Sequence, residues 1–225
     1  MKTVIKSLIV GAAMVGIAGV ANAIPTIYVS STGTAGSYSA VASSSSGSLT
    51  YSNNVGSWDI VVATGLTMPA LGTATSPTMD LDITGKTTSS TGGSVWIAFA
   101  ANGFSDPSGL IQAILSGHVV SGAAETVTFS VFDDTLNTQP TTTIPTGFTI
   151  ATLGPLSTPI LTTATAALLA GVPATLGVLM EISTTGSSST SMDGSFAPVP
   201  DGGVTALLLG AALFTLALLK RKVLA

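Results

Sequence analysis

Short runs of apolar and β-branched residues, each ended by Gly, Pro, Asn or Asp, recur through the middle of the chain. Residues 126–132 show the pattern most clearly, because every second side chain falls on one apolar face of a strand: Val127, Phe129 and Val131. The other face would carry Thr126, Thr128, Ser130 and Phe132. This period of two predicts a half-buried strand. Further candidate strands lie at residues 57–64, 79–84, 94–101, 111–120, 148–153, 159–163 and 176–184. Short strands between turn residues at this spacing predict an all-β fold, an antiparallel β-sandwich-like domain.

Four segments fit more than one structure. Residues 30–50 are rich in Ser, Gly and Ala and fit a flexible leader or paired edge strands; Tyr38 and the adjoining Tyr51 favour the strands. Residues 111–115 fit a helix or a strand, and residues 164–174 fit one or two helical turns ended by Pro173. Residues 185–198 fit a linker or a last short strand.

Composition limits what this body can bind. Residues 24–200 contain one basic residue, Lys86, and nine acids, which gives a net charge of −8. Nucleic-acid binding requires clustered Lys and Arg, so we expect no nucleic-acid partner. The chain has no cysteine, which excludes disulfides and thiolate metal sites. Ser and Thr make up 58 of these 177 residues, a composition that is also found in disordered stalks. Both tryptophans lie inside apolar runs, however, which favours a folded domain. We therefore expect a Ser/Gly-rich N-terminal part at 24–56 and a β-rich core at 57–184.

The first 23 residues have the composition of an export signal. The signal has a basic start at Lys2 and Lys6, an apolar run at 7–20, and small residues at Ala21 and Ala23. Cleavage by signal peptidase after Ala23 would leave Ile24 as the first residue of the mature protein. The alternative is a short membrane anchor that stays in place, but the run is short for a membrane span.

Residues 199–225 form a second apolar tail with three parts. A breaker motif comes first: Val199, Pro200, Asp201, Gly202 and Gly203. The 16 apolar residues 204–219 would form a helix of roughly 24 Å, a little short of a bilayer core of about 30 Å. A basic stop ends the tail: Lys220, Arg221 and Lys222. Basic residues favour the cytoplasmic side, so we expect one short C-terminal transmembrane helix with the body outside. A permanent anchor without special recognition is the simpler alternative.

The order of motif, apolar helix and basic end resembles the PEP-CTERM sorting signal of exported bacterial proteins. The common Val-Pro-Glu-Pro form appears here with the acid kept as Asp201 and with Gly202 in place of the second proline. The resemblance implies recognition of residues 199–225 by an exosortase, a membrane-embedded protease-transpeptidase. It also implies processing of the protein and its delivery to the cell surface or extracellular matrix, alongside exopolysaccharide production.

Candidate chemical groups are few. His118 is the single histidine, and no serine lies in a G-x-S-x-G motif, so we expect a half-exposed strand residue at 118 and no catalytic residues. Two acid pairs, Asp80 with Asp82 and Asp133 with Asp134, fit an oxygen-liganded Ca²⁺ site or a glycosidase pair. They also fit surface and strand-end acids, which is the interpretation we favour, with no metal and no cofactor.

Two further hypotheses concern what the body does. An exposed Trp58 or Trp96 would form a stacking platform for a glycan, although tryptophan inside an apolar strand is typical of a core. Low charge and strands rich in Ser, Thr and Val would also permit edge pairing between copies in a surface fibre. The sequence therefore predicts a non-enzymatic surface or matrix component, with a glycan-binding module or a fibre subunit as alternatives.

Overall fold

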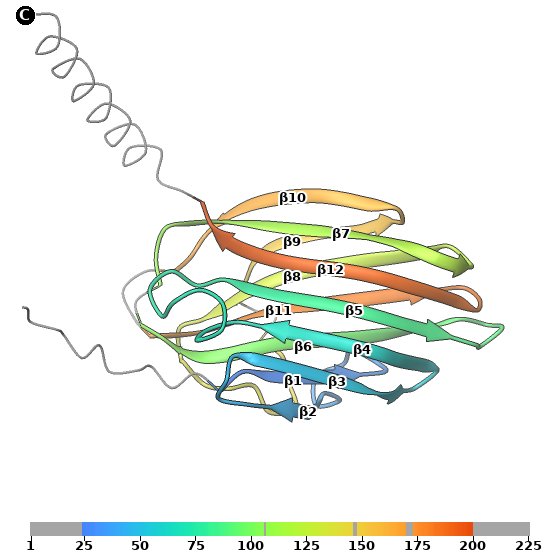
Figure 1. The fold of residues 1–225 in the computed structure, drawn as a ribbon, viewed down its shortest axis with the longest axis horizontal. Coiled ribbons are helices and arrows are strands. Elements are labelled where there is room, and N and C mark those ends of the chain that lie inside the picture. The colour runs from blue at the N-terminus through green and yellow to red at the C-terminus, as the bar shows by residue number, and fades with distance from the viewer. Residues whose placement is uncertain (1–23, 106, 146–147, 170–172, 200–225) are drawn as a thin grey trace, which may run out of the picture.

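Two six-stranded antiparallel sheets pack face to face in the computed structural model, which describes residues 24–105, 107–145, 148–169 and 173–199 (Figure 1). Sheet A runs, in spatial order, β2 (Ser39–Ser43), β1 (Thr26–Ser30), β6 (Gly93–Phe104), β11 (Ala174–Thr184), β8 (Glu125–Asp134) and β9 (Thr149–Ser157). Sheet B runs β10 (Ile160–Ala167), β7 (Leu110–Gly122), β12 (Ser188–Pro198), β5 (Met79–Thr87), β4 (Trp58–Leu66) and β3 (Ser48–Val55). The predicted all-β, antiparallel sandwich-like fold is confirmed. The predicted transmembrane helix at 204–219 lies outside the described residues, and within them no helix is long and apolar enough to cross a membrane.

The core lies between the sheets and follows the period-two pattern of the strands. Val127, Phe129 and Val131 of β8 are fully buried, as the alternation predicted. The ring of Phe129 crosses from sheet A to Gly194 of β12, where an added Cβ would overlap the ring and the Met180 side chain. Glycine at position 194 therefore leaves the room that the phenylalanine fills, and the two sheets interlock at this point.

A second, smaller apolar cluster covers the outer face of sheet A. Phe132 lies on this opposite face of β8, as predicted, but it is buried with Tyr28, Tyr38 and Ile144. The segment after β8 closes over them: the Tyr28 hydroxyl donates to the carbonyl of Pro140, and Gln139 Nε2 donates to the carbonyl of Ala100. The long β8–β9 connection is therefore part of the packed structure.

The expected helical turns at 164–174 are wrong for the part that the structure describes. Residues 164–167 continue β10, which pairs with β7 down to Ala167 opposite Leu110. Alternating burial explains why these residues form a strand: Ala164 and Ala166 pack toward the core, while Thr163 and Thr165 are exposed. Pairing along a sheet edge has overridden the helix propensity of alanine here.

The other open segments are strands. Residues 111–115 belong to β7, and residues 30–50 contribute the end of β1, all of β2 and the start of β3. Residues 188–198 form β12, which lies in the middle of sheet B with β7 on one side and β5 on the other. Of the two alternatives for 185–198, the last strand is the one that forms, and it is longer than expected: residues 188–196 pair with both β5 and β7, and residues 197–198 pair with β7 alone.

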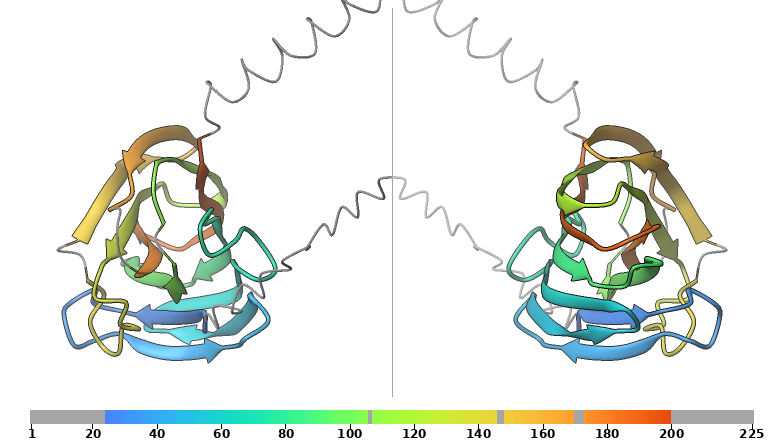
Figure 2. Two further views of the ribbon diagram at one scale, coloured as in Figure 1. Left: turned by 90° about the vertical axis from the view of Figure 1, so that its left-hand side faces the viewer. Right: turned by 90° about the vertical axis from the view of Figure 1, so that its right-hand side faces the viewer.

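The two ends of the sandwich differ and are named here for later use. The tail end, on the left in Figure 1 and facing the viewer on the left of Figure 2, is where the described chain begins at Ile24 and where β12 ends. Its connections include residues 44–47, 67–78, 135–145 and 168–169. The distal end is the opposite one, with the connections at 56–57, 88–92, 123–124, 158–159 and 185–187.

Candidate functional site

Most residues of the two predicted processing signals lie outside the described part of the chain. This holds for Ala21 and Ala23, for Pro200, Asp201, Gly202 and Gly203, and for Lys220, Arg221 and Lys222. Val199, the first residue of the breaker motif, is described. Its amide donates to the carbonyl of Leu110 at 2.8 Å, which extends the pairing of β12 with β7 by one residue. The motif therefore begins inside the fold.

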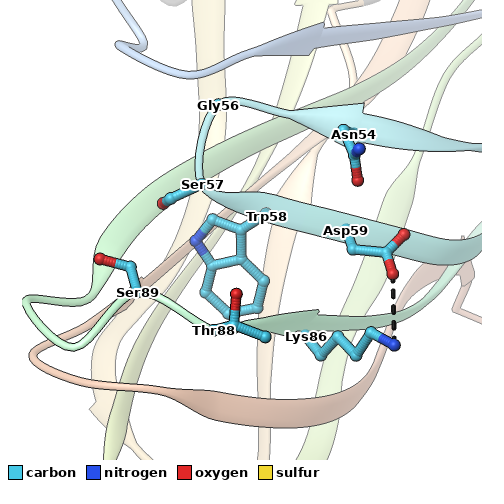
Figure 3. A pocket seen from close by; sticks show the side chains of 8 residues that line it. All are labelled: Asn54, Gly56, Ser57, Trp58, Asp59, Lys86, Thr88 and Ser89. Carbon is cyan, nitrogen blue, oxygen red and sulfur yellow. Dashed lines mark ion pairs between the residues drawn. The ribbon is translucent and has the colours of Figure 1, made fainter.

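A polar hollow of about 460 Å³, here called the distal cleft, opens at the distal end where β4 begins and β5 ends (Figure 3). Its lining residues are Asn54, Gly56, Ser57, Trp58, Asp59, Lys86, Thr88 and Ser89. Asp59 and Lys86 face each other because β4 and β5 pair in that register. Their carboxylate and ammonium groups lie 3.4 Å apart. Both side chains are about half exposed, so the pair adds at most about 1 kcal/mol to stability.

Trp58 lines this cleft but is only 1% exposed. Its indole Nε1 is buried and has no hydrogen-bond partner among the described residues. Figure 3 shows this nitrogen directed toward the end of the cleft where Ser57 and Ser89 lie, away from the Asp59–Lys86 pair. Buried donors are nearly always paired, so this N–H is a specific exception beside an open cleft. The exposed stacking platform considered for Trp58 is wrong, because its ring faces are covered.

Trp96 is half-buried on the outer face of sheet A, beside the small apolar cluster. Gly33 lies against its ring so closely that an added Cβ would overlap the indole. The connection after β1 therefore covers one side of this ring, and the ring is only partly available for stacking.

A shallow groove of about 450 Å³ beside β7 and β10 contains His118 and Asp193, with Ser116 and Ser191 next to them. His118 is a strand residue, as expected; its side chain is exposed, and it pairs across the sheet with Ser191. No hydrogen bond joins the His118 side chain to these described neighbours. Activation of a serine nucleophile requires such a bond between base and nucleophile, so the groove lacks the geometry of a triad.

Three acids form a row on the outer face of sheet B, where Asp193 of β12 lies opposite Asp82 of β5 with Asp80 beside them. Partial burial raises the pKa of Asp80 to about 6, and the charges of Asp82 and Asp193 and a hydrogen bond with Asp193 add to the rise. Burial and the charge of Asp193 also raise the pKa of Asp82. Asp80 and Asp82 share one face, as predicted. In the described part of the chain, no set of three or more acidic or histidine side chains is arranged to hold a metal ion.

The inner face of β8 carries an acid at each end. Asp133 is fully buried at the tail end, where one carboxylate oxygen accepts the amide of Leu169 at 2.7 Å and the other has no hydrogen-bond partner among the described residues. Burial raises the pKa of this carboxyl. Asp134 accepts the amide of Leu136 at 2.9 Å and so caps the end of the strand. The second predicted acid pair therefore binds backbone groups at the end of its strand.

Glu125 is the buried acid at the distal end of the same strand, and the sequence analysis did not single it out. The Ser188 hydroxyl lies 2.6 Å from its Oε1, while Oε2 and the nearby Thr190 hydroxyl have no hydrogen-bond partner. Burial raises the pKa of Glu125, and the hydroxyls of Ser188 and Thr190 offset part of the rise. The Thr190 hydroxyl is therefore close enough to stabilise the charged form of the Glu125 carboxylate, although the two groups do not have the geometry of a hydrogen bond.

Comparison with known proteins leaves the function open. The chain matches no protein-family model and no curated protein sequence. Among solved structures it is similar to the K1 cleaved adhesin domain of Lys-gingipain from Porphyromonas gingivalis. The identity is 9%, the match covers 68% of this chain and 99% of that chain, and the TM-score is 0.30. At that level the likeness carries no argument, so function is argued from the chain's own residues.

Proposed function

We propose that this protein is an exported bacterial surface or extracellular-matrix component, sorted through its C-terminal tail and associated with exopolysaccharide. Signal peptidase removes residues 1–23, and an exosortase recognises the motif at 199–203. The membrane holds the precursor through residues 204–219, and the mature sandwich has a structural, non-enzymatic role.

The observation that carries this proposal is the junction between sandwich and tail. β12 pairs with both β5 and β7 up to Phe196 and with β7 alone up to Pro198, and the Val199 amide is hydrogen-bonded to Leu110. The breaker motif, the apolar stretch and the basic residues then follow without an intervening linker. The described sandwich therefore ends where the segment that we propose as a sorting signal begins. Ile24, which would be the first residue after signal cleavage, lies directly before β1.

Truncation after Val199 tests the proposal in the bacterium, because it keeps β12 and the Val199 hydrogen bond while it removes the rest of the tail. We expect the full chain to reach the surface or matrix, and the truncated chain to leave the cell unprocessed at its C-terminus and unattached. If the full chain and the truncated chain were found in the same cellular fraction, sorting by the tail would be contradicted.

A second candidate function, glycan binding, is favoured by the unpartnered Nε1 of Trp58. A sugar hydroxyl at the end of the distal cleft where Ser57 and Ser89 lie would accept this N–H after a small shift of the groups that cover it. The side chains of Asp59, Lys86 and Asn54, on the other side of the cleft, offer hydrogen bonds to the rest of the glycan. Orientation by a few convergent polar groups is typical of small-molecule sites. On this proposal Trp58 binds through its edge and does not stack.

Tryptophan fluorescence tests glycan binding at the cleft. In the Trp96→Phe variant, Trp58 is the sole tryptophan, and we expect dextran or another neutral polysaccharide to shift its emission. Lys86→Ala should weaken the apparent affinity about tenfold, the effect of losing about 1.4 kcal/mol of hydrogen bonding. The matched control is Trp58→Phe, in which only Trp96 reports and the signal should be unchanged. A response confined to Trp96 would contradict binding at the distal cleft.

A further inference from the structure

Exposed large apolar side chains gather at the tail end. Six lie there, with these exposed fractions: Ile24 49%, Leu110 53%, Leu136 69%, Phe148 39%, Leu169 42% and Val199 38%. The other exposed large apolar residues of the described chain are Val61, Val120 and Leu161, of which the last two lie toward the distal end. Single exposed apolar residues are ordinary, but six at one end form a feature of the surface.

These six residues come from separate connections that the fold brings together. Val199 bonds to Leu110, Leu169 bonds to Asp133 at the end of β8, and the amide of Ile24 lies 3.4 Å from Asn102 Oδ1 near the end of β6. Leu136 and Phe148 flank the β8–β9 connection at this same end. The apolar residues therefore belong to both sheets, and they surround the point where the chain leaves the sandwich.

Charge is scarce around them. Of the described acids at the tail end, Asp133 and Asp134 are buried, and Asp80, the second residue of β5, is partly buried. The single described lysine, Lys86, lies at the distal cleft. Among the described residues, this end combines several exposed apolar side chains with few charges, which suits the interface of a zwitterionic bilayer, where binding depends on buried apolar area.

The chain between Val199 and residue 204 limits how far this end can stand from a membrane. Five residue steps span at most about 17 Å when fully extended. The headgroup layer on one side of a bilayer is already about 5–7 Å thick. If residues 204–219 span the membrane, the tail end is held at the bilayer surface.

We propose that the tail end is a membrane-contact surface of the anchored precursor, in which Leu110, Leu136, Phe148 and Leu169 enter the headgroup region of the bilayer. This inference rests on the anchoring that the proposed function includes. It fixes the orientation of the sandwich, with the distal cleft pointing away from the membrane. Contact ends when the tail is cut.

Site-directed fluorescence on the full chain tests this orientation, because the protein has no cysteine of its own. An environment-sensitive fluorophore is attached at Leu136→Cys or Leu110→Cys, with Val120→Cys and Leu161→Cys as matched controls at exposed apolar positions toward the distal end. Each variant is reconstituted into phosphatidylcholine vesicles, with or without nitroxide-labelled lipid. We expect a blue shift and severalfold stronger quenching at positions 110 and 136 than at 120 and 161.

Sedimentation of the same vesicles separates the two proposals. If the chain sediments with the vesicles but positions 136 and 161 are quenched equally, the membrane-contact surface is wrong and anchoring stands. If the chain stays in the supernatant, both are wrong. A blue shift at 136 that depends on protein concentration and not on labelled lipid would assign this surface to a second copy of the chain, and would overturn the inference.

Discussion

Phe129→Ala is expected to lower the free energy of unfolding by about 3–5 kcal/mol, the usual cost of removing a fully buried phenylalanine ring. The ring is fully buried and is the side chain of sheet A that reaches Gly194 in sheet B. With glycine opposite, no neighbouring side chain at position 194 can move in to fill the space. The measurement is chemical denaturation, in which the midpoint should fall while the slope stays unchanged.

Phe148→Ala is the matched control, because it removes the same ring from a position that is 39% exposed at the tail end. We expect its cost to be within about 1 kcal/mol, as for other substitutions at the surface. Equal losses at positions 129 and 148 would contradict the packing of the two sheets through Phe129.

Glu125→Gln is expected to stabilise the folded protein at pH 7 by about 1–2 kcal/mol, because it removes an uncompensated buried charge. Its carbonyl can still accept the Ser188 hydroxyl. Its amide can donate to the Thr190 hydroxyl oxygen, which has no partner beside the native carboxylate. The thermal midpoint should rise by roughly 2–8 °C for a chain of this size.

The pH dependence of stability follows from the same burial. Since the pKa of Glu125 is raised by folding, the unfolded chain releases this proton at a lower pH than the folded one. Between the two pKa values the folded state holds more protons, so stability falls as the pH rises through that window. Asp80, with a pKa of about 6, acts in the same direction between about pH 4 and pH 6.

Thermal midpoints at pH 4 and pH 7 measure this effect. The wild-type protein should be more stable at pH 4, and Glu125→Gln should reduce the difference without abolishing it, because Asp80 remains. Glu181→Gln, at a half-buried position on the outer face of sheet A, is the control for the substitution itself. A wild-type protein that gains stability as the pH rises from 4 to 7 would contradict the buried, unpaired state of these acids.

The sequence predicts the strands well wherever one face is uniformly apolar. The period-two pattern of β8 is complete because Val127, Phe129 and Val131 all meet the opposite sheet. β12 is harder to recognise, since its inward positions include Ser188, Thr190 and Gly194. These small residues fit around Glu125 and Phe129 of β8. Their burial can therefore be predicted only if the partner strand, more than 60 residues away in sequence, is known.

The candidate sites depend even more on long-range pairing. Asp59 and Lys86 meet only through the register of β4 and β5, and the free indole nitrogen of Trp58 becomes notable only once its surroundings are known. The apolar tail end has no sequence signature, because its residues come singly from separate connections. In contrast, the proposed export signal and sorting tail are local patterns, which can be recognised in a sequence without knowledge of the fold.

Sorting by the tail is the central claim, and the intact mass of the protein tests it most directly. The protein is recovered separately from the membranes and from the surrounding matrix of the bacterium, and each fraction is weighed by mass spectrometry. We expect the matrix to hold a species that starts at Ile24 and lacks the apolar residues 204–219. A single species that keeps the chain to Ala225 and stays in the membrane would contradict the claim, and would reduce the motif at 199–203 to the start of a permanent anchor.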